Sequence, residues 1–217
     1  MSTITVTAFR WVPPMVQGLV RDLRVRWALE EAGLAYRTRL IGPAEQQSAD
    51  YQRLQPFGQV PVFEEDGLVL FESGAIVMHI AERCEALMPS EHAARARTKA
   101  WMFAALNSVE QFVQALTELD LFYAGEEWAP LRRPALMAAA QRRLSKLAQW
   151  LEGRDFLEGR FTAADLLMTT VLRTPRHTDL LPQYPVLDDY RRRCEARPAF
   201  QTALADHMAP FAANAPR

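Results

Sequence analysis

The chain changes character near Cys84. Before this residue, short strand-like and helix-like segments alternate, whereas no segment after it shows the two-residue periodicity of a strand. Alternating strands and helices predict an α/β domain, and a long run of helical patterns predicts a separate helical domain. We therefore expect residues 1–84 to fold as one domain, residues 85–90 to form a linker, and residues 91–217 to form an all-helical domain.

The first domain is expected to contain a mixed four-stranded sheet. Residues 4–9 alternate as a strand, and residues 35–41 give a second strand candidate. Apolar side chains between them recur every four residues, which predicts an amphipathic helix that ends at Gly33. Two more strands are expected on either side of Asp66-Gly67, because Asp-Gly between two apolar runs is typical of a hairpin.

Helical segments follow Ser90, which is placed to cap the first of them. Prolines and glycines separate these segments. The expected helices are residues 91–123, 134–151, 162–173, 186–196 and 198–206.

A proline interrupts the third predicted strand, in Gln59-Val60-Pro61-Val62. Proline lacks a backbone donor, and sheets accept it only at edges or bulges. One use of a proline at such a position is a cis bond between Val60 and Pro61, which turns the Val60 backbone outward to pair with an extended peptide. The alternative is a plain edge strand on which the proline only blocks aggregation.

Glu72 and Ser73 stand where the last predicted strand gives way to a helix. The Ser73 hydroxyl is expected to cap this helix, and the amides of a first helical turn suit a carboxylate ligand. The Glu72 carboxylate suits an ammonium group. Because the head of an α-amino acid has both groups, this turn predicts a site for a small peptide. The alternative is a capped helix with an acidic first turn.

Three sets of residues, in this order, resemble the soluble glutathione S-transferases. They are Arg24-Val25-Arg26-x-Ala28-Leu29-Glu30-Glu31, then Gln59-Val60-Pro61-Val62 with the hairpin and Glu72-Ser73-x-Ala75-Ile76, then Gly159-Arg160-Phe161-Thr162-Ala163-Ala164-Asp165. The resemblance covers essentially the whole chain. It implies a thioredoxin-like domain followed by a helical one. Together with the proline inside the third predicted strand, it leads us to expect a cis bond between Val60 and Pro61.

The resemblance also implies site residues. Glutathione, as co-substrate, would be bound by Gln59, Val60, Pro61, Glu72 and Ser73. Thr162 and Asp165 resemble the capping box of the family, a structural motif in which the two side chains exchange bonds at a helix N-terminus.

The sequence departs from the family where a thiol-activating group is expected. The family keeps a Tyr, Ser or Cys after the first strand or at the start of the first helix, and residues 8–27 contain no Ser, Thr, Cys or Tyr. The catalytic group is therefore unassigned, with Arg10, Trp11, Gln17 and Arg21 as candidates beside the first-turn amides of the helix. The alternative is that the arginines are solvated and Trp11 is packed.

The resemblance implies a cytoplasmic homodimeric transferase of the kind used in detoxification, which conjugates glutathione with an apolar electrophile. The electrophile would lie in a cleft between the domains, with a helical wall from residues 101–112. The missing hydroxyl favours a second hypothesis, a non-catalytic glutathione- or ligand-binding protein on the same fold. A third is a glutathione-dependent isomerase, although the Ser-Ser-Cys run of that class is absent.

Composition excludes several other classes. The chain has 25 basic and 26 acidic residues, so no basic excess favours a nucleic-acid partner. Its two cysteines and four histidines show no metal-ligand spacing, and the cysteines supply no disulfide framework. No apolar run reaches the ~20 residues of a membrane span, and the first residues lack a signal-peptide pattern. We therefore expect no metal, no nucleic acid, no membrane and a reducing, cytoplasmic setting.

Overall fold

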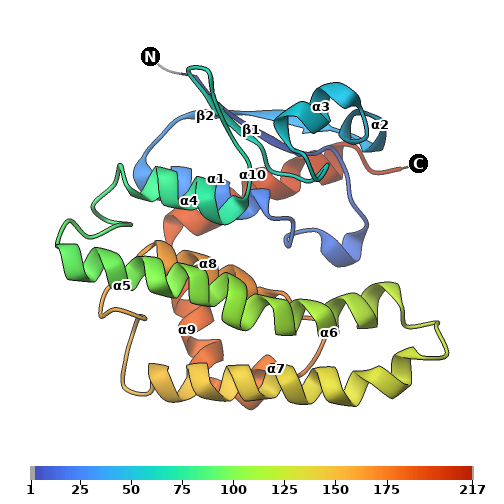
Figure 1. Ribbon diagram of the computed structural model, residues 1–217, viewed down its shortest axis with the longest axis vertical. Coiled ribbons are helices and arrows are strands. Elements are labelled where there is room, and N and C mark those ends of the chain that lie inside the picture. The colour runs from blue at the N-terminus through green and yellow to red at the C-terminus, as the bar shows by residue number, and fades with distance from the viewer. Residues whose placement is uncertain (1–2, 217) are drawn as a thin grey trace. The chain divides into compact units, whose positions relative to one another are not determined.

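The computed structural model describes residues 3–216, which fall into two compact units. The first unit contains residues 3–88 together with residues 197–216, and the second contains residues 89–196. Figure 1 shows the elements of both in chain order. No helix in the described part of the chain is long and apolar enough to cross a membrane.

The first unit is built on a mixed four-stranded sheet in the order β2-β1-β3-β4. β1 (Ile4–Phe9) pairs in parallel with β2 (Tyr36–Ile41) and antiparallel with β3 (Phe63–Glu65), which pairs with β4 (Leu68–Leu70). The two residues between β3 and β4 have φ values of 48° and 84°, as a tight hairpin turn requires. The mixed sheet and its hairpin are therefore confirmed.

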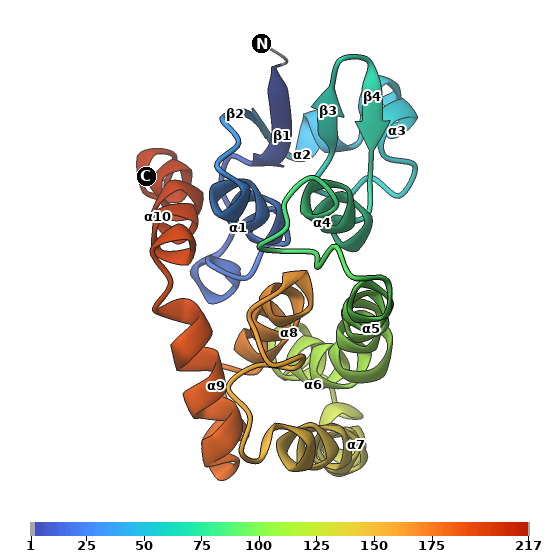
Figure 2. The same ribbon diagram turned by 90° about the vertical axis from the view of Figure 1, so that its left-hand side faces the viewer.

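Two helices lie side by side on one face of this sheet (Figure 2). They are α1 (Asp22–Ala32) and α4 (Ser73–Ala81). Gly33 ends α1 with a φ of 65°, the left-handed conformation expected of a glycine at this position. Two short helices, α2 (Pro43–Gln46) and α3 (Ala49–Leu54), connect β2 to β3.

The C-terminal helix, α10 (Pro198–Ala213), belongs to the first unit. It packs along α1, where the Phe200 ring meets Trp27 edge-on with centroids 4.8 Å apart. Arg197 also donates two hydrogen bonds, of 2.6 and 2.8 Å, to the carboxylate of Glu31. The expected helical domain of residues 91–217 includes α10, whereas in the structure α10 belongs to the first unit. Helical periodicity in the sequence does not reveal on which unit a helix packs.

The second unit is entirely helical within its described residues. α5 (His92–Phe103) and α6 (Gln111–Phe122) are joined by a π-helix (Ala104–Glu110) into one continuous helical segment. This segment accounts for the single long helix that the sequence predicts. The unit also contains α7 (Ala129–Leu151), α8 (Ala163–Arg173) and α9 (Pro185–Glu195).

Two of these helices begin differently from the prediction. Glu91 caps α5, because its carboxylate accepts hydrogen bonds from the amides of Ala93 at 2.8 Å and Ala94 at 2.6 Å. The expectation that Ser90 caps this helix is therefore wrong. α7 begins at Ala129 and not at residue 134, so that Pro130 lies in its first turn, where a proline is tolerated, and Pro134 lies inside the helix.

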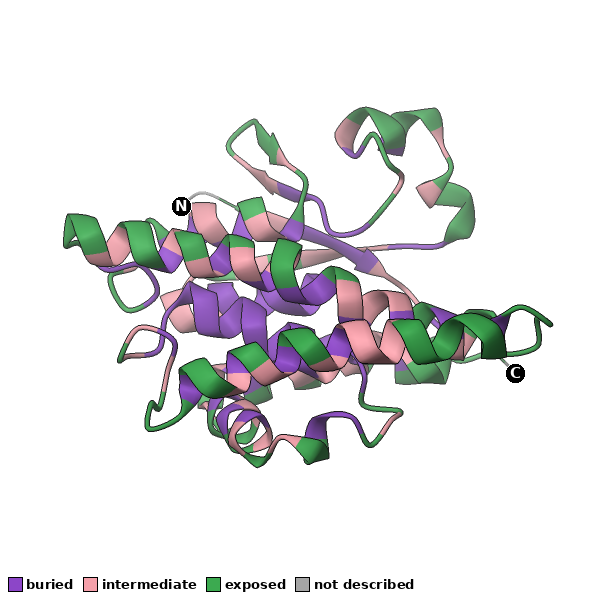
Figure 3. Cartoon of the chain, turned by 60° about the horizontal axis from the view of Figure 1, so that its bottom comes forward, coloured by how far each residue is buried: buried purple, intermediate pink, exposed green. Residues whose placement is uncertain are grey.

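α8 is buried along nearly its whole length, whereas the outer helices alternate exposed and buried positions (Figure 3). Thr162 Oγ1 accepts from the Ala164 amide at 3.3 Å, and Asp165 accepts from the Thr162 amide at 2.9 Å. Asp165 also accepts from the Leu157 amide and the Tyr190 hydroxyl, both at 2.9 Å. Burial raises the pKa of Asp165, although these donors oppose the shift. The arrangement holds a buried helix start in place.

A buried charged cluster joins α1 to α10. Asp22 accepts a hydrogen bond from Arg26 Nε at 2.8 Å and lies 3.0 Å from Nδ1 of His207. All three residues are at most 2% exposed. Burial by itself raises the pKa of Asp22, but His207 and Arg26 together hold it below the ordinary value. The carboxylate is therefore kept ionised inside the unit.

Replacing this carboxylate should destabilise the first unit strongly. Asp22→Asn leaves Arg26 as an uncompensated buried charge, so we expect the free energy of unfolding to fall by ~3–5 kcal/mol. Urea unfolding at neutral pH measures this. Asp206→Asn, an exposed change on α10, is the control and should stay within ~0.5 kcal/mol of wild type.

The same cluster predicts a pH dependence. Because the pKa of Asp22 in the folded state lies below the ordinary 3.8, the pair contributes stability above that pH. This contribution is lost as the pH falls through the folded-state pKa, so the wild type should lose more stability in acid than Asp22→Asn does. Equal acid losses in the two proteins would show that Asp22 does not act in this way.

Candidate functional site

The peptide bond between Val60 and Pro61 is cis, as the sequence predicts. The segment runs beside β1, since the Thr7 amide donates to the Val62 carbonyl at 2.8 Å. The Tyr51 hydroxyl donates to the Gln59 carbonyl at 2.6 Å and so anchors the preceding residue to α3. The Val60 side chain packs into the small apolar core that includes Tyr51 and Val62.

The backbone of Val60 has hydrogen-bonding capacity to spare. Among residues 3–216, nothing forms a hydrogen bond with its amide or its carbonyl. Backbone donors and acceptors in folded proteins are nearly always paired with protein, water or ligand. Val60 therefore offers one donor and one acceptor to a molecule from outside the chain.

Glu72 and Ser73 form the turn into α4. Glu72 is exposed and has a φ of 70°, which is uncommon for a residue with a side chain and occurs preferentially at functional sites. Ser73 is the first residue of α4 and only 5% exposed. It lies at a helix N-terminus, where backbone N–H groups favour an anion.

The side chain of Ser73 does not act as the expected cap. The N-cap position belongs to Glu72, whose side chain makes no capping bond. Ser73 Oγ instead accepts a hydrogen bond of 3.2 Å from Nη1 of Arg24, a residue of α1 that is 4% exposed. The sequence interpretation misses this role of Arg24, because nothing in a pattern links residues 49 positions apart.

The four catalytic candidates are not equally placed. Arg10 donates to Glu45 on α2 at 3.0 Å, and this hydrogen bond lowers the pKa of the Glu45 carboxyl. Gln17 donates to the Val12 carbonyl at 2.9 Å and so closes the loop before α1. Trp11 and Arg21 are half-buried, and Arg21 directly precedes α1. Arg10 and Gln17 thus have structural partners within the first unit.

The first-turn amides of α1 are partly occupied as well. The Leu23 amide donates to the Val20 carbonyl at 3.1 Å, and the Arg24 amide donates to the Arg21 carbonyl at 3.2 Å. The sequence predicts that the first-turn amides are open to an anion, whereas in the structure the amides of Leu23 and Arg24 bond to carbonyls of the chain itself. These two amides are therefore weaker candidates than the sequence predicts.

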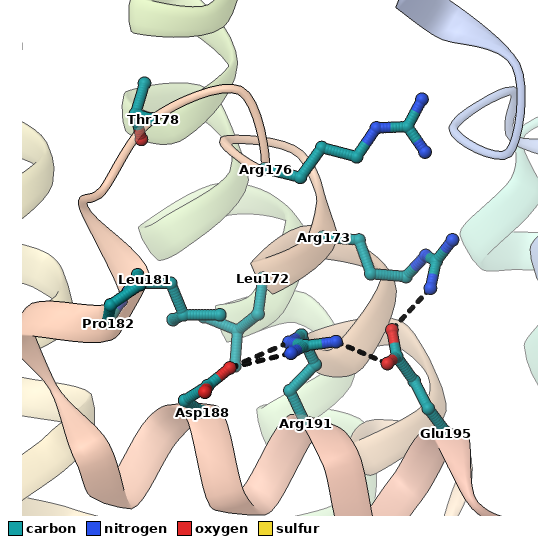
Figure 4. A pocket seen from close by; sticks show the side chains of 9 residues that line it. All are labelled: Leu172, Arg173, Arg176, Thr178, Leu181, Pro182, Asp188, Arg191 and Glu195. Carbon is teal, nitrogen blue, oxygen red and sulfur yellow. Dashed lines mark hydrogen bonds and ion pairs between the residues drawn. The ribbon is translucent and has the colours of Figure 1, made fainter.

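A hollow of about 210 Å³ in the second unit holds a separate group of charges (Figure 4). Arg173 and Arg191 both bind Glu195, and Arg191 also binds Asp188 at 2.7 Å. Because these charges neutralise one another, we interpret the group as a brace between α8 and α9. No group of three or more His, Cys, Asp or Glu residues within the described range is arranged to hold a metal ion.

Residues 15–82 match the family model described as glutathione S-transferase, N-terminal domain. Glutathione S-transferase 4 of Zea mays is 28% identical over 235 aligned residues, covering 100% of this chain and 99% of that protein. The disulfide-bond oxidoreductase YfcG of Escherichia coli is 28% identical over 188 residues, covering 81% of this chain and 86% of that protein.

Solved structures agree with these relatives. The theta class glutathione S-transferase of Xanthomonas axonopodis pv. citri, solved with glutathione bound, is 26% identical, with a TM-score of 0.79. The similarity covers 94% of this chain and 98% of that one. Residues 15–82 thus match the N-terminal domain of glutathione S-transferases, and the chain as a whole, with its thioredoxin-like sheet and its helical unit, is similar to soluble members of that family.

Proposed function

We propose that the protein binds glutathione at the two turns around Val60 and Ser73 and conjugates its thiol with an electrophilic small molecule. One observation supports this above the others: the first unit combines an unpaired backbone edge at Val60 with a helix N-terminus at Ser73. A peptide with a free amino-acid head fits both. The bound glutathione of the Xanthomonas relative is consistent with this choice of ligand.

Each part of glutathione has a proposed partner. The amide and carbonyl of Val60 pair with the backbone of the cysteinyl residue, with Gln59 and the cis Pro61 shaping the edge. Ser73 and the amides at the start of α4 hold the carboxylate of the γ-glutamyl head. The exposed carboxylate of Glu72 faces the ammonium group of that head.

In the reaction, the glutathione thiol releases its proton to water and the thiolate sulfur forms a bond with the electrophilic carbon. In an aryl halide the halide then departs with its electron pair, and in an enone the displaced electron pair moves to the carbonyl oxygen. Binding both reactants together contributes through proximity. A cation near the sulfur favours the thiolate form, and Arg21 is the proposed source. Of the helical wall expected from residues 101–112, Phe103 offers an apolar surface, since it is 55% exposed while Met102 and Val109 are buried.

A second candidate is a glutathione-binding protein without turnover. The absence of Ser, Thr, Cys and Tyr from residues 8–27 favours it, because no hydroxyl there can donate to the sulfur. Titration calorimetry with glutathione, followed by conjugation assays with a panel of activated aryl halides and enones, separates the two. Binding without conjugation supports the second candidate, and absence of binding excludes both.

We also propose a reducing, cytoplasmic setting and a homodimer. Glutathione is a thiol co-substrate, and neither Cys84 nor Cys194 forms a disulfide in the structure. Phe57 is 69% exposed and its ring lies 6.2 Å from the ring of Phe71, which is 37% exposed, and neighbouring exposed apolar side chains favour a partner surface.

Ser73→Ala should weaken both glutathione binding and the fold, each by ~1.5–3 kcal/mol. In each case the hydroxyl bonds to a charged group, because it donates to the ligand carboxylate and accepts from the Arg24 guanidinium. Calorimetry gives the loss of affinity, and urea unfolding of the same variant gives the loss of stability. Unchanged affinity in a folded variant would remove Ser73 from the site.

Arg21→Gln should raise the pKa of the bound glutathione thiol. A cation that stabilises the thiolate lowers this pKa, and a tenfold change in the acid dissociation constant of the thiol corresponds to ~1.4 kcal/mol. Thiolate absorbance against pH, with saturating glutathione, measures it. Arg10→Gln is the matched control, because Arg10 is already paired with Glu45, and it should leave the thiol pKa unchanged. If Thr7→Val, which removes the hydroxyl that directly precedes residues 8–27, shifts the pKa and Arg21→Gln does not, a hydroxyl is the activating group.

The homodimer has a direct test. Light scattering at micromolar concentration should give the mass of two chains, and Phe57→Asp should shift the population toward one chain, because a charge cannot be buried there unpaired. Gln52→Asp places the same charge on an exposed residue of α3 and should not change the mass. A wild-type mass of one chain would refute the proposal.

A further inference from the structure

We propose that Arg24 is a positioning residue of the glutathione site, which orients the Ser73 hydroxyl so that its hydrogen is directed to the γ-glutamyl carboxylate. This inference rests on the proposed function. It assigns a role in ligand specificity to a side chain of α1 that does not itself touch the ligand.

The contact that carries the inference is buried. Arg24 Nη1 lies 3.2 Å from Ser73 Oγ, and the two residues are 4% and 5% exposed. α1 and α4 pack against one another in the first unit, so neither side chain is free to swing away. The geometry of the hydroxyl is thus set by the packing of two helices.

The hydrogen-bonding capacity of the two groups fixes the direction of the bond. A guanidinium donates only, and it keeps its charge in proteins. A hydroxyl has one hydrogen and two acceptor positions. With one acceptor position filled by Arg24, the hydroxyl hydrogen points elsewhere, and a carboxylate is the ligand group that accepts it most strongly.

Charge supports the same ligand group. Arg24 brings a positive charge inside the unit to the N-terminal end of α4, where the helix dipole is also positive. Both effects favour an anion next to Ser73. Burial keeps the guanidinium charge from being screened as a surface charge is.

A matched arginine is available on the same helix. Arg26 is 2% exposed, two residues further along α1, and its guanidinium binds Asp22 on the side of α10. Replacing it perturbs a buried charge of the same kind without touching Ser73. It therefore separates a loss of packing in α1 from a loss of specificity at the site.

The experiment compares two ligands on each variant. One ligand is glutathione, and the other is γ-aminobutyryl-cysteinyl-glycine, which lacks only the carboxylate of the γ-glutamyl head. Dissociation constants for both are measured by calorimetry on the full chain for wild type, Ser73→Ala, Arg24→Met, Arg24→Lys and Arg26→Gln. Urea unfolding confirms that each variant is folded.

We expect the wild type to prefer glutathione by ~10-fold or more, the range for a bond to a charged group. Ser73→Ala and Arg24→Met should both reduce this preference severalfold, and Arg24→Lys should restore part of it. Arg26→Gln should lower stability while keeping the wild-type preference.

Three results would overturn the inference. One is a folded Arg24→Met or Arg24→Lys variant that binds both ligands more weakly by the same factor, which is what a purely structural role gives. Another is an unchanged preference in Ser73→Ala, which removes the hydroxyl on which Arg24 acts. If wild type binds neither ligand, the proposed function fails and the inference fails with it.

Discussion

The first unit depends on the way α1 distributes three buried charged side chains. Asp22 and Arg26 are four residues apart and so share one side of the helix, while Arg24 lies two residues from each and points to the opposite side. Asp22 contacts both Arg26 and His207 of α10, and Arg24 donates to Ser73 of α4. One helix thus links the C-terminal segment of the chain to the turn that is proposed to bind the ligand.

Much of the fold can be predicted from the sequence because the relevant signals are local. Alternation marks β1 and β2, Asp-Gly marks the hairpin, and a glycine marks the end of α1. A proline inside a strand pattern indicates the cis bond before Pro61. Each of these features is decided by residues that are close in the chain, so its physical cause is visible in the sequence.

Features that depend on distant partners cannot be predicted in this way. The sequence predicts Ser73 as a cap, since serine before a helix usually caps it, but a guanidinium 49 residues away occupies its oxygen. Periodicity places α10 with its neighbours in sequence, in the helical domain, but Trp27 and Asp22 supply its packing surface. Arg10, a candidate catalytic residue, is paired with Glu45.

The membership of α10 in the first unit has a consequence for synthesis. Residues 89–196 form a compact unit of their own and are inserted between the two parts of the first. As the chain leaves the ribosome from its N-terminus, Asp22 and Trp27 are made long before Phe200 and His207, their partners. The first unit therefore stays incomplete until Phe200 and His207 have emerged, and the helical unit can fold earlier although it is encoded after residues 3–88. In a nascent chain that stops before residue 197, the Asp22 carboxylate and the Trp27 ring lack the partners that cover them in the complete unit. Such an exposed surface is suited to chaperone binding.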